Sequence, residues 1–413
     1  MFHPSQPDAY WRRHDDGFKL AEEGFVRSDT DGKPLETYTT VENLGGGSFG
    51  VTYSAISDKQ RDPSGAKQKP THVLKVILQT GAYEDAYDTA MLEYYASVLI
   101  DRVGKEFKNE VCNIRAVCAQ HVFTSEKNIV IVFPYENATS LAKFNLDGFH
   151  ESFEKDNYAY QLELFQLAYW MCDAVRVLNS FGIYHRDIKP ANMIVTLPLV
   201  NSGPVPTTTG LKLIDFGETC ASREEIARVR QVEDPLWFSA LTCDTVNRRN
   251  LFFYVKGAKR FIDPLAQGNL DNVGFRFIVK FEPTEEMNFG WNPYMVEYDE
   301  ANMKIMFPKF EMFACAMSID NLVNIKPYTS LVPREIDVNE PRLTTSMSDM
   351  LLKMTNLDWR ARPSSDDICT FFYNEHVNLV KRRSTVLIST LQTTTINTQA
   401  GERKKKHRHG KNE

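Results

Sequence analysis

The chain has 413 residues, of which 42% are hydrophobic and 25% charged, a composition typical of a globular protein. It has no apolar run of about 18 residues, which argues against a membrane span. Its first five residues lack the basic-then-apolar pattern of a signal peptide. The seven cysteines are scattered singly without a Cys-x-x-Cys pair, so we expect neither a disulfide framework nor a zinc site. This cysteine usage favours a reducing, cytoplasmic compartment.

Charge is spread unevenly along the chain. Residues 402–413 carry six Lys or Arg against two Glu, a net +4, which leaves −10 for the remainder of the −6 total. An acidic body is a poor general binder of nucleic acid, so we expect no specific nucleic-acid partner. The basic run at 403–409 has two interpretations, a solvated tail or a nuclear-import or polyanion-binding signal.

Residues 1–36 are polar and mixed, and we expect at most one short helix there, around Phe18 to Phe25. A strand is then indicated at 38–44 by its β-branched residues. It runs into a glycine-rich turn at 45–50. Glycines let backbone amides approach phosphate oxygens closely, although a plain hairpin turn would have the same composition.

A second strand is predicted at 72–78, with Lys75 among apolar residues. A lysine is costly to bury unless it is paired, so Lys75 either faces solvent from an edge strand or has a carboxylate partner. Residues 84–100 have the pattern of a helix, and Glu93 lies beside its apolar stripe. We therefore expect Glu93 rather than Glu84 to be the partner.

A buried-type strand is predicted at 128–135, and an apolar helix at 158–180 leads into a polar loop at 185–192. In that loop Asp187 can accept a proton, Lys189 can neutralise a phosphate, and Asn192 offers an amide oxygen to a hard cation. A surface loop with incidental charges is the alternative. A short strand at 211–214 precedes Asp215, Phe216 and Gly217, and Asp215 lies 28 residues after Asp187.

These stretches resemble the G-x-G-x-x-G, V-A-I-K, H-R-D-x-x-x-x-N and D-F-G motifs of eukaryotic-type protein kinases. The position of Lys189, two residues after Asp187, resembles the pattern of the serine/threonine branch of this family. The resemblance implies an α+β, bilobal fold with a small antiparallel β lobe plus one helix and a larger, mainly α-helical lobe. It divides the chain into an extension at 1–37, a kinase domain at 38–380 and a tail at 381–413, with small and large lobes at 38–136 and 137–380.

The resemblance also implies roles for individual residues, with ATP and Mg²⁺ as cofactors and a protein bearing a Ser or Thr acceptor as substrate. Asp187 would be the catalytic base beside Lys189 and Arg186, and Asn192 and Asp215 would hold Mg²⁺. Thr52 stands where the family has valine. Phe133 would close the back of the adenine pocket, and the backbone near Glu136 would pair with adenine. The nucleotide-contacting set would be Leu44, Gly45, Gly46, Gly47, Ser48, Phe49, Gly50, Thr52, Lys75, Glu93, Phe133, Glu136, Asn192 and Asp215.

Beyond Gly217 the match weakens. The stretch 239–241 stands in the place of A-P-E, with 292–294 as an alternative, and the glutamate is missing in both. In the family this glutamate pairs with an arginine, and by resemblance Arg362 stands in that position. Without the glutamate, Arg362 would need another anion. By resemblance, Glu311 stands where the family has the aspartate that begins the central helix of the large lobe. We expect the intervening residues 245–309 to be a β-rich insertion, either beside the cleft or on the outer surface.

Two further expectations concern activity. Arg186 could pair with a phosphate on Thr219, Ser222 or Thr242, unless the glutamates at 218, 224 and 225 make phosphorylation unnecessary. The function expected is phosphorylation of serine and threonine residues in proteins. The alternatives are a pseudokinase scaffold without turnover and a small-molecule phosphotransferase. Nothing in the residues indicates the oligomeric state.

Overall fold

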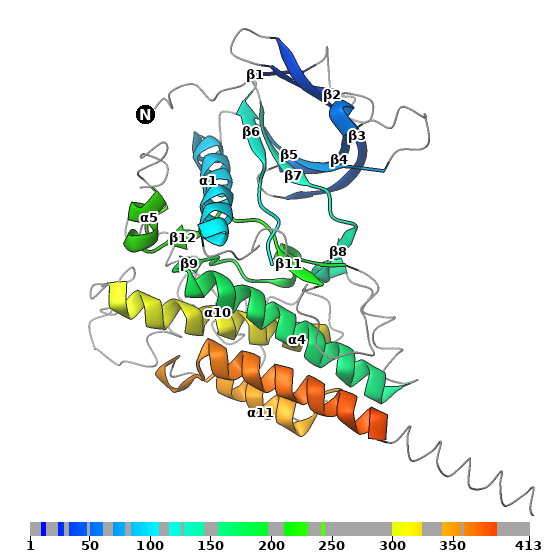
Figure 1. Cartoon of the computed structure of the whole chain (residues 1–413), viewed down its shortest axis with the longest axis vertical. Helices are drawn as coiled ribbons and strands as arrows, with labels where there is room; N and C mark the ends of the chain where they lie inside the picture. Colours follow the sequence, from blue (N-terminus) through cyan, green and yellow to red (C-terminus); the bar gives the residue numbers. More distant parts are fainter. Residues whose placement is uncertain are drawn as a thin grey trace, which may run out of the picture.

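The computed structural model describes residues 10–13, 24–28, 33–47, 50–60, 69–78, 84–106, 115–124, 128–143, 156–196, 210–229, 241–243, 300–323, 341–356 and 359–385. Figure 1 shows a lobe of strands above a lobe of long helices. This is the α+β, bilobal arrangement expected from the sequence. Among the described residues, no helix combines the length and apolar character of a membrane span.

The small lobe is built on one sheet that closes into a barrel in the order β1-β2-β3-β4-β5-β7-β6. Neighbouring strands are antiparallel, apart from β1 and β6, which are parallel and meet where Tyr10 pairs with Thr124. The strands are β1 (Tyr10–Arg13), β2 (Gly24–Ser28), β3 (Pro34–Gly47), β4 (Gly50–Ser57), β5 (His72–Leu78), β6 (His121–Thr124) and β7 (Asn128–Pro134).

The first two strands correct two expectations. Residues 24 and 25 lie in β2, so the expected helix at 18–25 is wrong in its described part. The boundary at 37/38 falls inside β3, and β1 and β2 belong to the sheet of the small lobe rather than to a separate extension. They close the barrel around a core of Phe25, Tyr38, Tyr53, Ala55, Leu74, Val76, Phe123, Val130 and Val132.

A second apolar layer lies between the sheet and α1 (Glu84–Glu106). Strand alternation assigns the residues to the two layers, because successive side chains of a strand point to opposite faces. In β5, Leu74 and Val76 enter the barrel, whereas Val73 and Ile77 face α1. Lys75 shares the face of Val73 and Ile77, so the period of two directs it toward α1.

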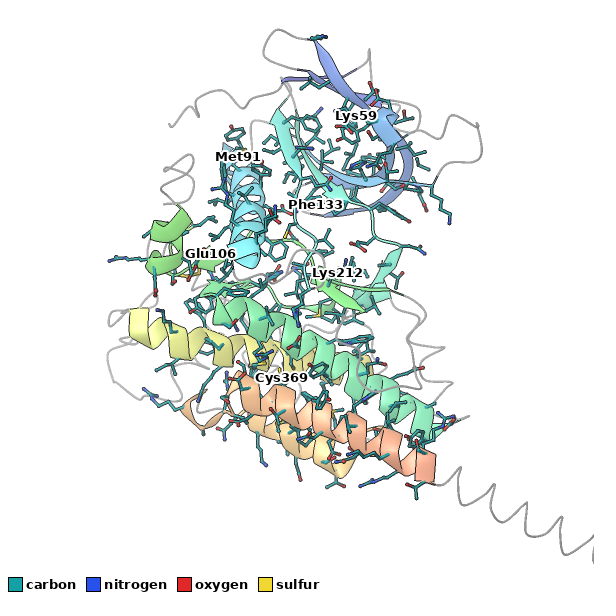
Figure 2. The ribbon with its side chains drawn as sticks, in the orientation of Figure 1. Lys59, Met91, Glu106, Phe133, Lys212 and Cys369 are labelled. Carbon is teal, nitrogen blue, oxygen red and sulfur yellow. A yellow bond between two sulfur atoms is a disulfide. The ribbon has the colours of Figure 1, made fainter. Side chains whose placement is uncertain are left out.

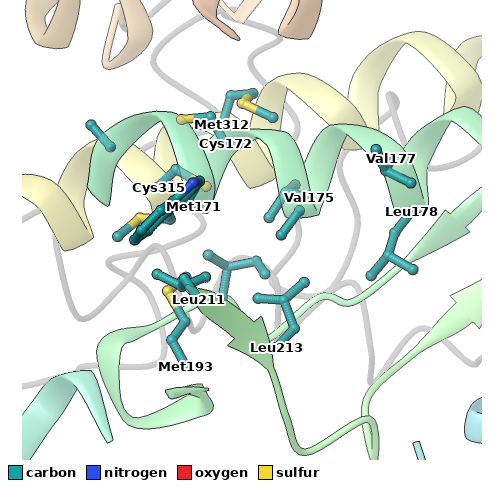
Figure 3. Close-up of a cluster of buried hydrophobic side chains, with 14 of the residues drawn as sticks. Met171, Cys172, Val175, Val177, Leu178, Met193, Leu211, Leu213, Met312 and Cys315 are labelled. Atoms are coloured by element: carbon teal, nitrogen blue, oxygen red, sulfur yellow. The ribbon is translucent and has the colours of Figure 1, made fainter. Parts of the chain in front are cut away.

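The large lobe packs α4 (Asn157–Ser180) against α10 (Glu300–Val323), with α11 (Thr345–Met354) and a helix at 365–385 beneath them. Asp156 caps α4 by accepting a hydrogen bond from the amide of Ala159 at 3.1 Å. Figure 3 shows Met171 and Cys172 of α4 beside Met312 and Cys315 of α10. These side chains belong to one buried core that extends to the strands below the cleft.

The helices also correct three boundaries. Glu311 lies within α10 and not at its start. Residues 300–309 are helical, so the expected β-rich insertion does not extend to 309, and its remaining part lies outside the described residues. The last helix runs to 385, so the proposed tail boundary at 381 falls inside it.

The remaining elements are short. They are β8 (Ala138–Ser140), β9 (Ile183–Tyr184), β10 (Met193–Thr196), β11 (Leu211–Leu213), β12 (Cys220–Ala221), α5 (Arg223–Val229) and the 3-10 helices at Asp58–Gln60, Leu141–Lys143, Pro190–Asn192 and Trp359–Ala361. β8, β10 and β11 form one small sheet, and β9 pairs with β12. Cys220 and Cys243 form a disulfide, which the expectation of unpaired cysteines did not foresee.

Candidate active site

An ion-pair chain joins the two lobes at the centre of the molecule. Lys75 Nζ lies 2.6 Å from Glu93 Oε2 on α1 and 2.9 Å from Asp215 Oδ1. Although burial opposes its charge, the two carboxylates raise the pKa of Lys75 above its usual range. Burial likewise opposes ionisation of Asp215, but Lys75 outweighs it and lowers the pKa of Asp215. Both groups are therefore charged at neutral pH.

The loop after β9 brings the next three polar side chains together. The Oδ2 atom of Asp187 accepts hydrogen bonds from Lys189 Nζ and from Asn192 Nδ2, the latter at 2.8 Å. Asn192 Nδ2 also donates to the backbone oxygen of Asp187 at 2.9 Å. Asn192 sits in the 3-10 helix Pro190–Asn192, which turns it back toward Asp187. Asp187 keeps part of its carboxylate exposed to solvent.

His185 ties this loop to the segment that holds Asp215. The ring is fully buried, and burial lowers the pKa of His185, so the imidazole is neutral. Nε2 lies 3.0 Å from the carbonyl oxygen of Ile214, and Nδ1 accepts from the amide of Asp187 at 3.3 Å. These partners require the tautomer with its proton on Nε2. His185, for which no role was predicted, positions both sides of the site.

The glycine-rich turn is described except for Ser48 and Phe49. Gly45 has a φ of 147° and donates its amide to Asn43 Oδ1 at 2.9 Å. A Cβ on Gly50 would lie 2.3 Å from the carbonyl oxygen of Val76, so the approach of β4 to β5 requires glycine there. Leu44, Gly46 and Gly47 lie in β3, and Thr52 pairs with Lys75 across β4 and β5.

The segment that links the lobes follows β7. Phe133 is buried in the layer under α1, with Ile214 packed against it. Glu136 Oε1 lies 2.6 Å from Lys212 Nζ, an ion pair that ties the linking segment to β11. Figure 2 shows Phe133 at the lower end of the small lobe and Lys212 in the large lobe below it. The role of Lys212 was not predicted from the sequence, because its partner Glu136 lies 76 residues away along the chain.

The side chain of Arg186 is buried, although the residue belongs to the loop. Its φ is 66°, and its amide donates to Glu311 Oε1 of α10 at 2.7 Å. Burial raises the pKa of Glu218, and the nearby charge of Arg186 opposes that rise. Two carboxyl groups, Glu218 and Glu311, thus lie near the buried guanidinium.

The three hydroxyls considered as phosphorylation sites, those of Thr219, Ser222 and Thr242, belong to buried residues. Ser222 precedes α5, and its Oγ accepts a hydrogen bond from the amide of Glu225. Backbone hydrogen bonds join Ala221 to Leu241 and to Cys243. Of the A-P-E candidates, only Leu241 is described, and it is buried.

Arg362 finds partners other than the missing glutamate. Its Nε donates to the carbonyl of Asn356 at 2.8 Å and its Nη1 to that of Lys309 at 3.2 Å. The guanidinium carbon also lies 4.7 Å from the ring centre of Phe313. Carbonyl oxygens and the face of an aromatic ring therefore accompany this cation.

The donor atoms fit a magnesium ion bound with a nucleotide. Because Asn192 Nδ2 is turned to Asp187, the amide oxygen is left for a cation. Asp215 commits Oδ1 to Lys75 and has a second carboxylate oxygen. Mg²⁺ prefers such hard oxygen ligands, usually one or two from the protein beside phosphate and water.

Comparison with known families matches residues 38–240 to the model of the protein kinase domain. This part of the chain is a protein kinase domain of the eukaryotic type. The match includes the small lobe from residue 38 within β3 onward, the linking segment, the catalytic loop and the residues around Asp215, and it stops before α10.

Among curated relatives, the kinase domain is 28% identical over 193 residues to the probable serine/threonine-protein kinase fhkC of Dictyostelium discoideum, covering 47% of this chain and 27% of that protein. It is 25% identical over 171 residues to cyclin-dependent kinase B1-1 of Arabidopsis thaliana, covering 39% of this chain and 48% of that protein. The aligned part therefore spans less than half the length of these relatives.

Proposed function

We propose that this kinase domain transfers the γ-phosphoryl group of ATP to serine and threonine hydroxyls of protein substrates. The observation that carries the proposal is the convergence of Asp187, Lys189 and Asn192 in one loop with Lys75, Glu93 and Asp215 across the cleft. Phosphoryl transfer needs positioning and charge neutralisation more than covalent chemistry, and these groups supply both.

Asp187 would orient the attacking hydroxyl and accept its proton on a carboxylate oxygen. Lys189, hydrogen-bonded to the same carboxylate, would neutralise charge on the transferring phosphoryl group. Lys75 is charged, and Glu93 holds it beside Asp215. From there Lys75 would bind the α- and β-phosphates when these approach Asp215. Asn192 and Asp215 would hold Mg²⁺, which supplies neutralisation of the phosphate oxygens when bound.

The test compares wild-type protein with Asp187→Asn in a radiolabelled-ATP assay on a degenerate peptide library. We expect Asp187→Asn to lower kcat by about 10²–10⁴-fold, because a general base is removed, while nucleotide binding is kept. Lys75→Met should inactivate the protein by mispositioning the phosphates. Near-normal turnover in Asp187→Asn would contradict the assignment of the base.

A scaffold without turnover is the second candidate. Thr52 in place of valine and the altered A-P-E region favour it. The Lys75–Glu93 ion pair and the Asp187–Asn192 hydrogen bonds favour the enzyme. Purified protein that binds ATP but labels no peptide in the library, at several protein and Mg²⁺ concentrations, would favour the scaffold.

A further inference from the structure

The activation segment, defined here as residues 215–243, is closed on itself by a covalent bond. Cys220 and Cys243 form a disulfide with a Cα–Cα distance of 5.0 Å and a sequence separation of 23 residues. Cys220 lies in β12, three residues after Gly217, and α5 lies inside the closed loop. The bond therefore joins the start of the segment to its far end.

The anchored end of this loop lies directly against the catalytic residues. Cys220 pairs with Tyr184 and Ala221 with Ile183 in the β12–β9 ladder, and β9 leads straight into His185, Arg186 and Asp187. Both cysteines pack with Tyr184 and Phe307, whose rings stack at 4.8 Å. A change in the position of the activation segment thus reaches the loop that holds Asp187 through the short strand β9.

The far end of the segment is tied to β12 by backbone hydrogen bonds. The amide of Ala221 donates to the carbonyl of Leu241 at 2.9 Å, and the amide of Cys243 donates to that of Ala221 at 3.0 Å. Leu241 also belongs to the large-lobe core, and Cys243 packs with Tyr184 and Phe307, so apolar contacts accompany the disulfide at this end. Removing the covalent link enlarges the set of open conformations that the loop can reach.

We propose that Cys220 and Cys243 are a redox modification site that sets the activity of the kinase domain, with low-molecular-mass thiols and disulfides as exchange partners. In reduction, two thiols RSH attack in turn, the Cys220–Cys243 bond breaks, and two protein thiols and one RSSR result. In oxidation, RSSR is the oxidant and leaves as two RSH. The bonded state holds the segment on β9, and the reduced state releases it. The effect on activity rests on the proposed phosphotransfer, whereas the effect on the segment does not.

Of the other described cysteines, Cys118 is also disulfide-bonded, and three are free thiols that do not share this chemistry. Cys172, Cys315 and Cys369 are free and buried in the large-lobe core. Burial raises the pKa of Cys369 and of Cys172, which suppresses the reactive thiolate. The Cys220–Cys243 bond is itself buried, so thiol exchange requires the activation segment to open first. The bond thus restrains the same opening that exposes it to exchange.

The experiment uses the full chain purified without reductant. Alkylation with iodoacetamide followed by peptide mass mapping should find the Cys220 and Cys243 peptides linked. Dithiothreitol should then speed proteolytic cleavage within 221–242 and lower peptide phosphorylation by about 5–10-fold, and oxidised glutathione should restore both. The double variant Cys220→Ser/Cys243→Ser should stay at the reduced level in either condition. Cys369→Ala, the matched control, should respond like wild type.

Two results would overturn the proposal. One is alkylation of both Cys220 and Cys243 after purification without reductant. The other is a linked pair whose reduction changes neither cleavage within 221–242 nor phosphorylation. A protein that phosphorylates nothing in either state contradicts the proposed function instead, and the cleavage rates then decide whether the bond holds the segment.

Discussion

Two residues of the site hold a backbone conformation that is unfavourable for them. Arg186 and Asp215 have φ values of 66° and 65°, in the left-handed region that side chains other than glycine adopt at a cost. The amide of Arg186 is bound by Glu311 and the carboxylate of Asp215 by Lys75. Such conformations persist where surrounding contacts over-determine them, and in this chain the contacts come from α10 and β5.

His376, in the helix at 365–385, predicts a pH dependence of stability. The side chain is fully buried, neither ring nitrogen has a hydrogen-bond partner among the described residues, and burial lowers the pKa of His376 to about 4. The unfolded histidine titrates near 6.5, so the unfolded chain binds the extra proton between these values. Stability is therefore complete above pH 6.5 and falls as the pH drops toward 4.

The measurement is the free energy of unfolding of wild type and His376→Leu at pH 7 and pH 5. Wild type should lose about 2 kcal/mol more than the variant over this interval, because only it carries the buried imidazole. Other titrating groups change both proteins alike and cancel in the comparison. Equal losses would show that His376 does not become charged on unfolding.

At the scale of elements, the Lys212–Glu136 ion pair joins β11 to the segment between the lobes. Lys212→Met should raise KM for ATP by about tenfold with kcat within twofold, because an unpaired, largely buried Glu136 shifts the backbone beside the adenine site. Steady-state kinetics separate the two constants. Lys105→Met is the matched control, since Lys105 lies 2.6 Å from Asp101 in an exposed pair. If the two variants had the same KM, the pair would have no positioning role.

The activation segment predicts independence from phosphorylation. Thr219, Ser222 and Thr242 are buried, and Glu218 already lies near Arg186. Phosphatase treatment should therefore leave peptide phosphorylation within twofold of the untreated protein, and Thr219→Val should do the same. Mass spectrometry after treatment confirms that phosphate is gone. A fall of more than fivefold would show that a phosphate is needed to order the segment.

At the scale of the whole molecule, β1 and β2 turn an open sheet into a closed barrel. Phe25 of β2 is buried in the barrel core. Phe25→Ala should lower the free energy of unfolding by about 3 kcal/mol, through lost burial and the cavity left behind. Leu35→Ala, at an exposed position of β3, is the control and should change it by less than about 0.5 kcal/mol. Denaturant unfolding measures both, and equal values would show that β2 adds nothing to the core.

Several elements followed from the sequence because local patterns specify them. The strand at 72–78 has the predicted bounds, and the helix predicted at 84–100 begins at Glu84 and continues to Glu106. The helix predicted at 158–180 begins and ends within a residue of its prediction. The spacing of Asp187, Lys189 and Asn192 placed them in one loop because all three lie within six residues.

The chain alone determined the kinase resemblance and the residues proposed to carry the chemistry, since motifs are local and their side chains are read directly. Only the tertiary structure decided what meets across long separations. Examples are Glu311 on the amide of Arg186, Lys212 on Glu136, and Cys220 bonded to Cys243. It also brought residues 10–13, 24–28 and 34–37 into the sheet of the small lobe. These contacts depend on how helices and strands pack together, and packing leaves no periodic signal in the residues that it joins.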